Sequence, residues 1–145
     1  HTPGAVKTVY RLLDMGIRPY IIRAAIRAIV GQRLLRRLCP ICRLPYQVQQ
    51  NSREGHFLGE AYRPEDIYYH HNPQGCPQCG HTGFIGRIAI HEILCFSEEL
   101  SEEPKDKEVG ASLISSDCLL STMREDGIAK ALAGEIQLEE LMNIF

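Results

Sequence analysis

Two Cys-x-x-Cys motifs constrain the fold of this chain more than any other feature. They are Cys39-Pro40-Ile41-Cys42 and Cys76-Pro77-Gln78-Cys79. Two residues between cysteines let the backbone turn around one metal ion, and four thiolates fill the tetrahedral shell that zinc prefers. We therefore predict a structural Zn²⁺ site whose ligands are Cys39, Cys42, Cys76 and Cys79. A redox-active dithiol or an iron centre is the alternative use of the same cysteines.

The composition is that of an ordinary globular chain. Its 145 residues are 44% hydrophobic and 23% charged, which fits one compact domain or one domain with a small lobe. No segment approaches the roughly 18 apolar residues of a membrane span, and no signal sequence is evident, so we expect a cytosolic protein. Because four cysteines stand in metal-type motifs, we expect the other two, Cys95 and Cys118, to pack in a core.

Charge is distributed unevenly along the sequence. Residues 1–50 carry nine Lys and Arg residues against one acidic residue, a local charge of +8, while residues 51–96 carry −2 and residues 97–145 carry −8. This gradient indicates that the basic third faces an anion or an acidic neighbour, and that the acidic third is a solvated surface. Alternatively, the opposite charges of the two ends of the chain simply offset one another.

Hydrophobic periodicity predicts the first elements. Apolar residues at helical spacing favour a helix from Thr2 to Gly16 and a second amphipathic helix from Pro19 through Ile29. The segment 31–38, which leads into the first motif, fits a strand or a helix equally well. We therefore leave its secondary structure open.

The rest of the chain divides into a loop, a strand and helices. The sequence between the two motifs has little hydrophobic periodicity, so we expect an irregular loop that the metal stabilises. Loss of the metal should disorder residues 39–80 while sparing the helical ends. Ile88–Leu94 alternates and predicts a strand. The patterns that follow favour helices over 98–103, 119–132 and 138–144, with a linker at 110–116.

The residues that flank the two motifs resemble a known family. They are Gly31-Gln32-Arg33-Leu34-Leu35-Arg36-Arg37-Leu38 before the first motif and Gly80-His81-Thr82-Gly83-Phe84-Ile85-Gly86-Arg87 after the second. Leu13-Asp14-Met15-Gly16, Met123-Arg124-Glu125-Asp126-Gly127 and Leu138-Glu139-Glu140 match in the same order. Together they resemble the C-terminal region of type II secretion and type IV pilus assembly ATPases, in the secretion NTPase superfamily.

This resemblance implies an α/β fold, present here as an α+β fragment with four parts. Residues 1–38 would be the end of a RecA-like ATPase core, 39–80 an inserted Cys₄ zinc subdomain, 81–96 a strand that returns to the core, and 97–145 a C-terminal helical lobe.

The resemblance also implies a function. Members of this family are hexameric cytoplasmic motors, peripheral at the bacterial inner membrane, which use ATP and Mg²⁺ to power pseudopilus or pilus assembly and protein secretion on membrane platform proteins. A phosphate-binding loop has the form G-x-x-x-x-G-K-[ST], and no segment of this chain matches it. We therefore expect the 145 residues alone to be catalytically inactive, and we expect no direct contact with nucleic acid.

Several side chains are candidates for sensing nucleotide or contacting a neighbouring subunit. His1 resembles the end of the family's histidine box, near the γ-phosphate. The other candidates are Gln32, Arg33, Arg36 and Arg87. Each arginine can bind a phosphate or carboxylate through two hydrogen bonds, or instead form a structural ion pair or a solvated face. We expect Glu92 to be an ion-pair partner.

The remaining polar residues carry weaker expectations. A Cys₄ shell leaves no position for the histidines of the loop between the motifs, His56, His70 and His71. We expect His70 and His71 to be exposed, and His81 would be the nearest substitute ligand. Gln137 stands where the family often has a Ser or Thr cap, so it should weaken the last helix by about 1 kcal/mol.

Two other functional classes compete with the motor interpretation. The first is a freestanding zinc-ribbon module that binds nucleic acid, supported by the basic first third. Aromatic residues are not interleaved with those basic residues, however, and the net charge is −2. The second is a dithiol oxidoreductase, which would hold no stoichiometric metal.

Overall fold

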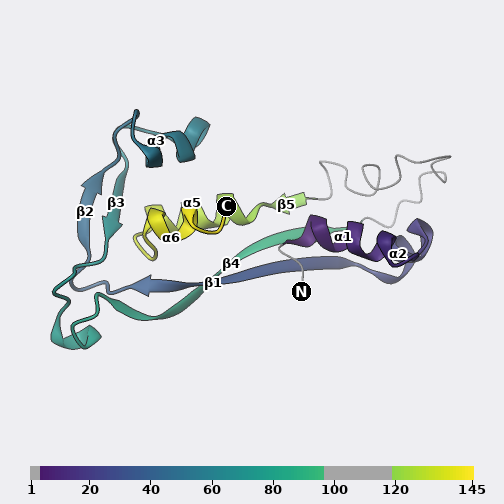
Figure 1. Ribbon diagram of the computed structural model, residues 1–145, viewed down its shortest axis with the longest axis horizontal. Helices are drawn as coiled ribbons and strands as arrows, with labels where there is room; N and C mark the ends of the chain where they lie inside the picture. The colour runs from purple at the N-terminus through teal and green to yellow at the C-terminus, as the bar shows by residue number, and fades with distance from the viewer. Residues whose placement is uncertain (1–3, 97–118) are drawn as a thin grey trace. The chain divides into compact units, whose positions relative to one another are not determined.

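The computed structural model of the chain describes residues 4–96 and 119–145 (Figure 1). Its α-helices are α1 (Ala5–Asp14), α2 (Pro19–Ala25), α3 (Arg53–Leu58), α5 (Met123–Leu132) and α6 (Leu138–Met142). Its strands are β1 (Ala28–Leu38), β2 (Leu44–Gln47), β3 (Ile67–His70), β4 (Phe84–Cys95) and β5 (Leu119–Ser121), and its 3₁₀ turns are η1 (Gly59–Ala61) and η2 (Pro77–Cys79). Helices mixed with antiparallel sheet make an α+β structure, consistent with the predicted class.

The strands form two sheets. The larger has the order β1-β4-β5, and β5 pairs antiparallel to β4 with Ile93 opposite Ser121. The smaller is the antiparallel pair of β2 and β3, in which Tyr46 lies opposite Tyr68. This second sheet lies wholly between the two cysteine motifs.

The described residues group into two compact units. The first takes its described residues from His1–Gln32 and His91–Met123, and the second consists of Arg33–Ile90 and Arg124–Phe145. The long strands β1 and β4 each contribute residues to both units. No helix in the described ranges is long and apolar enough to cross a membrane.

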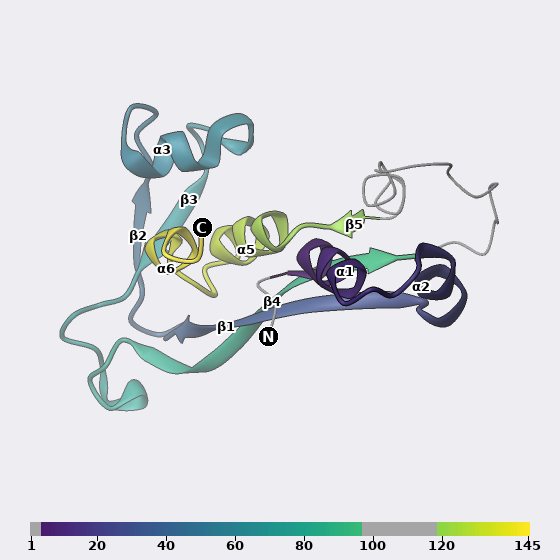
Figure 2. The same ribbon diagram turned by 45° about the vertical axis from the view of Figure 1, so that its right-hand side comes forward.

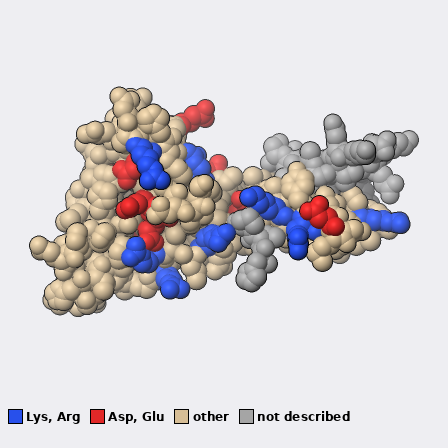
Figure 3. All heavy atoms as spheres, in the orientation of Figure 1, with Lys and Arg blue, Asp and Glu red and all other residues tan. Residues whose placement is uncertain are grey.

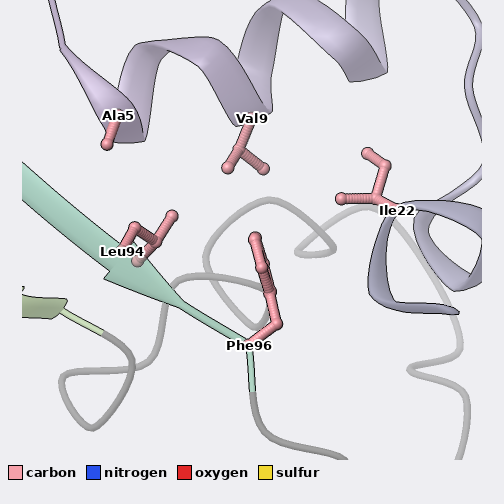
Figure 4. Close-up of a cluster of buried hydrophobic side chains, with 5 residues drawn as sticks. All are labelled: Ala5, Val9, Ile22, Leu94 and Phe96. Carbon is pink, nitrogen blue, oxygen red and sulfur yellow. The ribbon is translucent and has the colours of Figure 1, made fainter. Parts of the chain in front are cut away.

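The first unit packs α1 and α2 around one apolar cluster. Figure 4 shows the five buried side chains of this cluster, which are Ala5, Val9, Ile22, Leu94 and Phe96. They come from α1, α2 and the end of β4, so the predicted apolar stripe of the first helix does face a core. Gly16 ends this helix with a φ of 82°, a conformation that glycine adopts without strain.

Glu92 has a different role from the one we predicted. Its Oε1 accepts a hydrogen bond from the backbone N–H of Val6, at 3.1 Å, in the first turn of α1. A carboxylate at this position satisfies an otherwise free donor and complements the positive end of the helix dipole. Gly4 permits the approach, because a Cβ at that position would lie 2.8 Å from Glu92 Oε1. Glu92 therefore caps a helix.

The second unit joins the segment between the motifs to the C-terminal helices. Helix α6 contacts both α3 and β3 (Figure 2). Its Leu138 and Leu141 are fully buried. Leu58 of α3 and Tyr68 of β3 are also buried. Side chains from both parts thus form the interior of one compact unit.

Three predictions about secondary structure are wrong. The second helix ends at Ala25, and Ile29 lies in β1. Segment 31–38, whose secondary structure we left open, is the rest of that strand. Leu119–Ser121 is also strand, and α5 begins only at Met123. In both cases β-branched or leucine-rich sequence pairs with the distant β4, and such pairing overrides local helical spacing.

The third error concerns the segment between the motifs, which is not an irregular loop. It contains β2, α3, η1 and β3, with Ser52 as the N-cap of α3, where its hydroxyl accepts a hydrogen bond from Gly55 N at 3.0 Å. The strand over Ile88–Leu94 is confirmed and extends from Phe84 to Cys95. The predicted helix at 98–103, the linker at 110–116, Cys118 and His1 lie outside the described residues.

Candidate metal centre

The four cysteines of the two motifs meet at one point. Their Sγ atoms all lie within 4.8 Å of one another, and no other group of three or more potential metal ligands was found in the described ranges. Individual separations are 3.7 Å from Cys39 to Cys76, 3.9 Å from Cys42 to Cys79 and 3.7 Å from Cys76 to Cys79. The sulfurs are therefore close neighbours although the two motifs are far apart in the sequence.

These separations match the shell of a tetrahedral metal. With zinc–sulfur bonds of about 2.3 Å, a regular tetrahedron has sulfur–sulfur edges of about 3.8 Å. These three distances bracket this value, and all four Sγ atoms lie within 4.8 Å of one another, so the donor set fits zinc in the number of its ligands and in these separations. Four thiolates would close the coordination sphere and leave no position for a reactive water. Zinc bound here would supply folding free energy.

Backbone geometry holds the second motif in shape. Cys79 Sγ accepts hydrogen bonds from the N–H groups of Cys76 and Gly83, each at 3.2 Å. The chain reverses at Gly80 and Gly83, with φ of 58° and 76°. A side chain at Gly83 would also collide with the backbone, because its Cβ would lie 2.6 Å from Asn72 O. Glycine is therefore required where the chain leaves the motif.

The same hydrogen bonds set the acidity of the thiols. Burial opposes ionisation of Cys79, but N–H donors from Cys76 and Gly83 outweigh it and lower the pKa of its thiol to about 6. For Cys39, backbone donors from Cys42 and Ile41 likewise outweigh burial and lower its pKa. Burial and the neighbouring sulfurs raise the pKa of Cys42 to about 12. The pKa values of the thiols within one cluster are therefore shifted in opposite directions.

The predicted nucleotide-sensing residues do not gather at this centre. Gln32, Arg33 and Arg87 are exposed on β1 and β4, and neither arginine side chain has a polar partner within the described part of the chain. Arg36 is engaged with α6, where its guanidinium pairs with Glu140 and lies 4.1 Å from the centroid of Phe84. Arg36 therefore makes a structural ion pair within the second unit.

Basic side chains do not form one large patch on the visible face of either unit. Figure 3 shows Lys and Arg interspersed with Asp and Glu on that face. The ion pairs Arg37–Glu135 and Lys130–Asp126, at 3.0 and 2.6 Å, are examples of this mixing. Such neighbours lower the local positive potential that binding to a phosphate backbone requires.

The prediction that His70 and His71 form an exposed loop is wrong for the loop at His70, which belongs to β3, and wrong for the exposure of both, which are half-buried. His70 ends β3 and stacks on Tyr46, with ring centroids 3.6 Å apart. His71 stacks on Phe84 at 5.0 Å, and both its backbone N–H and its Nδ1 lie within hydrogen-bond distance of Gln137 Oε1, at 3.3 and 3.0 Å. His81 is exposed and does not belong to the group of ligands.

Gln137 has a role that the sequence did not indicate. As expected, its side chain makes no capping hydrogen bond at the start of α6. The side chain is instead 97% buried, with 3% exposed, and receives the hydrogen bonds from His71. Buried glutamine is uncommon, but no local pattern marks it, because its partner is 66 residues away.

Comparison with known proteins is consistent with this geometry. The model of the family described as type II/IV secretion system protein matches residues 1–143. The chain belongs to the type II/IV secretion system protein family. This match contains both cysteine motifs, so it favours the secretion interpretation over a freestanding zinc ribbon or a dithiol oxidoreductase.

Curated members of the type II/IV secretion family are similar over nearly the whole chain. Type II secretion system protein E of Aeromonas hydrophila is 35% identical over 99% of the chain, and type II secretion system ATPase E of Vibrio cholerae is 36% identical over 99%. Type IV pilus assembly ATPase PilB of Myxococcus xanthus is 35% identical over 98%. The chain covers only 28%, 28% and 25% of these three relatives.

Proposed function

We propose that this chain is the C-terminal, zinc-binding part of a type II secretion or type IV pilus assembly ATPase. The clustering of the Sγ atoms of Cys39, Cys42, Cys76 and Cys79 within 4.8 Å of one another carries this proposal, because it occurs within a chain that matches the family model over residues 1–143. The zinc is structural. It closes the subdomain of residues 39–80, which lies between the end of a RecA-like core and a C-terminal helical lobe.

The chemistry of ATP belongs to the rest of the parent protein. The three relatives are about four times as long as the region they share with this chain, and the chain has no phosphate-binding loop. The 145 residues alone should therefore not hydrolyse ATP. In the complete motor, His1, Gln32, Arg33 and Arg87 would contact nucleotide or a neighbouring subunit. Among the residues that the structure describes, neither arginine guanidinium has a polar partner, as such a contact requires.

The complete protein would act as a homo-hexamer at the cytoplasmic face of the inner membrane. There it would use ATP and Mg²⁺ to drive pseudopilus or pilus assembly on platform proteins. Relatives from both kinds of system match this chain at similar identity, which supports a part that is common to secretion and pilus motors.

A complementation experiment tests the proposed function. The full-length protein that contains this chain would be replaced in its host by a Cys39→Ser/Cys42→Ser variant, and export of a secreted enzyme and surface pili would be measured. We expect whichever process the parent drives to fall to the level of the deletion strain, while Cys95→Ser retains it. Normal export and normal pili in the double variant, with its zinc lost, would refute the proposal.

A further inference from the structure

Arg43 links the first cysteine motif to a helix that follows about ninety residues later. Its backbone N–H closes the motif by donating to Cys39 O at 3.1 Å. Its guanidinium donates to the carbonyl oxygens of Ala133, at 3.1 Å, and Gly134, just past the C-terminus of α5. The same guanidinium lies 4.3 Å from the centroid of the Tyr69 ring. One side chain thus supplies donors to two carbonyls of the turn that follows α5.

Residues immediately before the first motif contact the same segment. The N–H of Leu38 donates to Glu135 O at 2.8 Å, and Arg37 pairs with the Glu135 carboxylate at 3.0 Å. Arg36 donates its backbone N–H to Glu140 Oε2 at 3.0 Å, and its guanidinium pairs with the same carboxylate. Leu38 is fully buried at this junction. All these partners lie within residues 133–140, which comprise the turn after α5 and the start of α6.

The approach to the second motif adds a contact from another direction. His71, five residues before Cys76, is hydrogen-bonded to the buried side chain of Gln137 and stacks on Phe84. The guanidinium of Arg36 also lies over Phe84. Segments that flank both motifs therefore hold the turn between α5 and α6.

Arg43 directly follows Cys42, and its N–H bonds to Cys39 O. The shape of the turn from Cys39 to Cys42 therefore sets the direction in which Arg43 leaves the motif and reaches Gly134. We propose that metal binding at the four cysteines and docking of α5 and α6 are thermodynamically coupled through Arg43 and the residues beside it. This inference rests on the proposed zinc site and extends its effect to residues 123–142, which the sequence led us to expect would be spared.

Amide hydrogen exchange on the 145-residue chain, with Zn²⁺ bound and after its removal by a chelator, tests the coupling. We expect the amides of α5 and α6 to exchange at least about 10-fold faster without zinc, while those of α1, in the other compact unit, keep their rates. Unchanged rates in α5 and α6 would overturn the proposal. An equal acceleration in α1 would also overturn it, because the metal would then support the whole chain.

Coupling is reciprocal: if zinc binding favours docking of α5 and α6, docking favours zinc binding by the same factor, so a substitution that undocks them should weaken zinc binding. We would measure Zn²⁺ affinity by competition with a chelator for Arg43→Gln and for the matched control Arg53→Gln. Arg53 lies in the same unit, is exposed and has no side-chain partner in the ranges that the structure describes. We expect a loss of about 10-fold for Arg43→Gln and no loss for the control.

The outcomes separate the two proposals. If the unsubstituted chain binds one zinc, but the two variants bind it equally well, the zinc site stands and the coupling fails. If the unsubstituted chain binds no zinc, both proposals fail. Should Arg43→Gln not fold, Glu135→Gln removes the ion pair of Arg37 and is expected to lower zinc affinity in the same direction by a smaller factor.

Discussion

The guanidinium of Arg43 occupies the space that a side chain at Gly134 would fill. A Cβ at Gly134 would lie 2.7 Å from Arg43 Cζ and 2.7 Å from Tyr69 Cδ2. The residue also has a φ of 70°, which places it in the left-handed region. Glycine at this position therefore serves both the end of α5 and the contact with the first motif.

Gly134→Ala should lower the free energy of unfolding of the zinc-loaded chain by about 2 kcal/mol or more, because left-handed strain adds to the collision with Arg43. Urea unfolding measures this loss. Gly80→Ala is the matched control, since Gly80 has a φ of 58° but nothing within 4 Å of its Cβ. It should lose only about 1 kcal/mol. Equal losses would contradict the proposed contact.

Gly127→Ala tests the packing of α5 on α6. Its Cβ would lie 2.8 Å from Leu141 Cδ2, and Leu141 is fully buried and cannot easily move. Overpacking should lower the free energy of unfolding by about 2 kcal/mol, whereas the higher helix propensity of alanine should raise it by only about 1 kcal/mol. The net effect is a destabilisation. In a Leu141→Ala background the same substitution should stabilise. A double-mutant cycle without this change of sign would show that the two residues do not touch.

Tyr68→Phe should not reduce stability. The hydroxyl of Tyr68 is buried and has no hydrogen-bond partner in the described part of the molecule, so its removal relieves a desolvation cost. The control is Tyr46→Phe, because the Tyr46 hydroxyl donates to Glu54 at 2.7 Å. We expect that control to cost about 1.5 kcal/mol in urea unfolding. A comparable loss for Tyr68→Phe would reveal a partner for its hydroxyl.

Zinc affinity should fall as the pH falls, and more steeply below about pH 6. Ligands must lose their protons to bind, so each thiol that is protonated in the free chain and ionised in the complex reduces affinity about 10-fold per pH unit of acidification. Cys42, with its pKa raised to about 12, must lose a proton to bind zinc at any neutral pH, so it contributes to the fall in affinity across the neutral range. Cys79, with its pKa near 6, is protonated in the free chain only below that pH, so it makes the fall in zinc affinity steeper only there.

Chelator competition between pH 5 and 8 checks this slope. A dependence that stays constant through pH 6, rather than steepening, would contradict the lowered pKa of Cys79.

Much of the metal centre could be predicted because its signal is local. Two residues between each pair of cysteines indicate a metal site without reference to the rest of the fold, and Gly80 and Gly83 mark the turns beside it. The first helix was predictable for the same reason, since Val9 and its apolar neighbours recur at helical spacing.

The remaining features depend on partners that are distant in the sequence. Ile29 fits a helix by spacing but lies in β1, and Leu119–Ser121 is a strand only because it pairs with β4. Gln137 and His71 are ordinary polar residues until packing brings them together across 66 positions. Local patterns carry no information about such contacts.

The zinc content of the purified chain tests the central claim most directly. Elemental analysis after exhaustive dialysis should find one zinc per 145-residue chain. Substitution of Cys39, Cys42, Cys76 or Cys79 by Ser should remove or greatly weaken this binding, while Cys95→Ser should retain it. Absence of stoichiometric metal in the unsubstituted chain, or full retention of zinc after loss of any two of the four cysteines, would contradict the account.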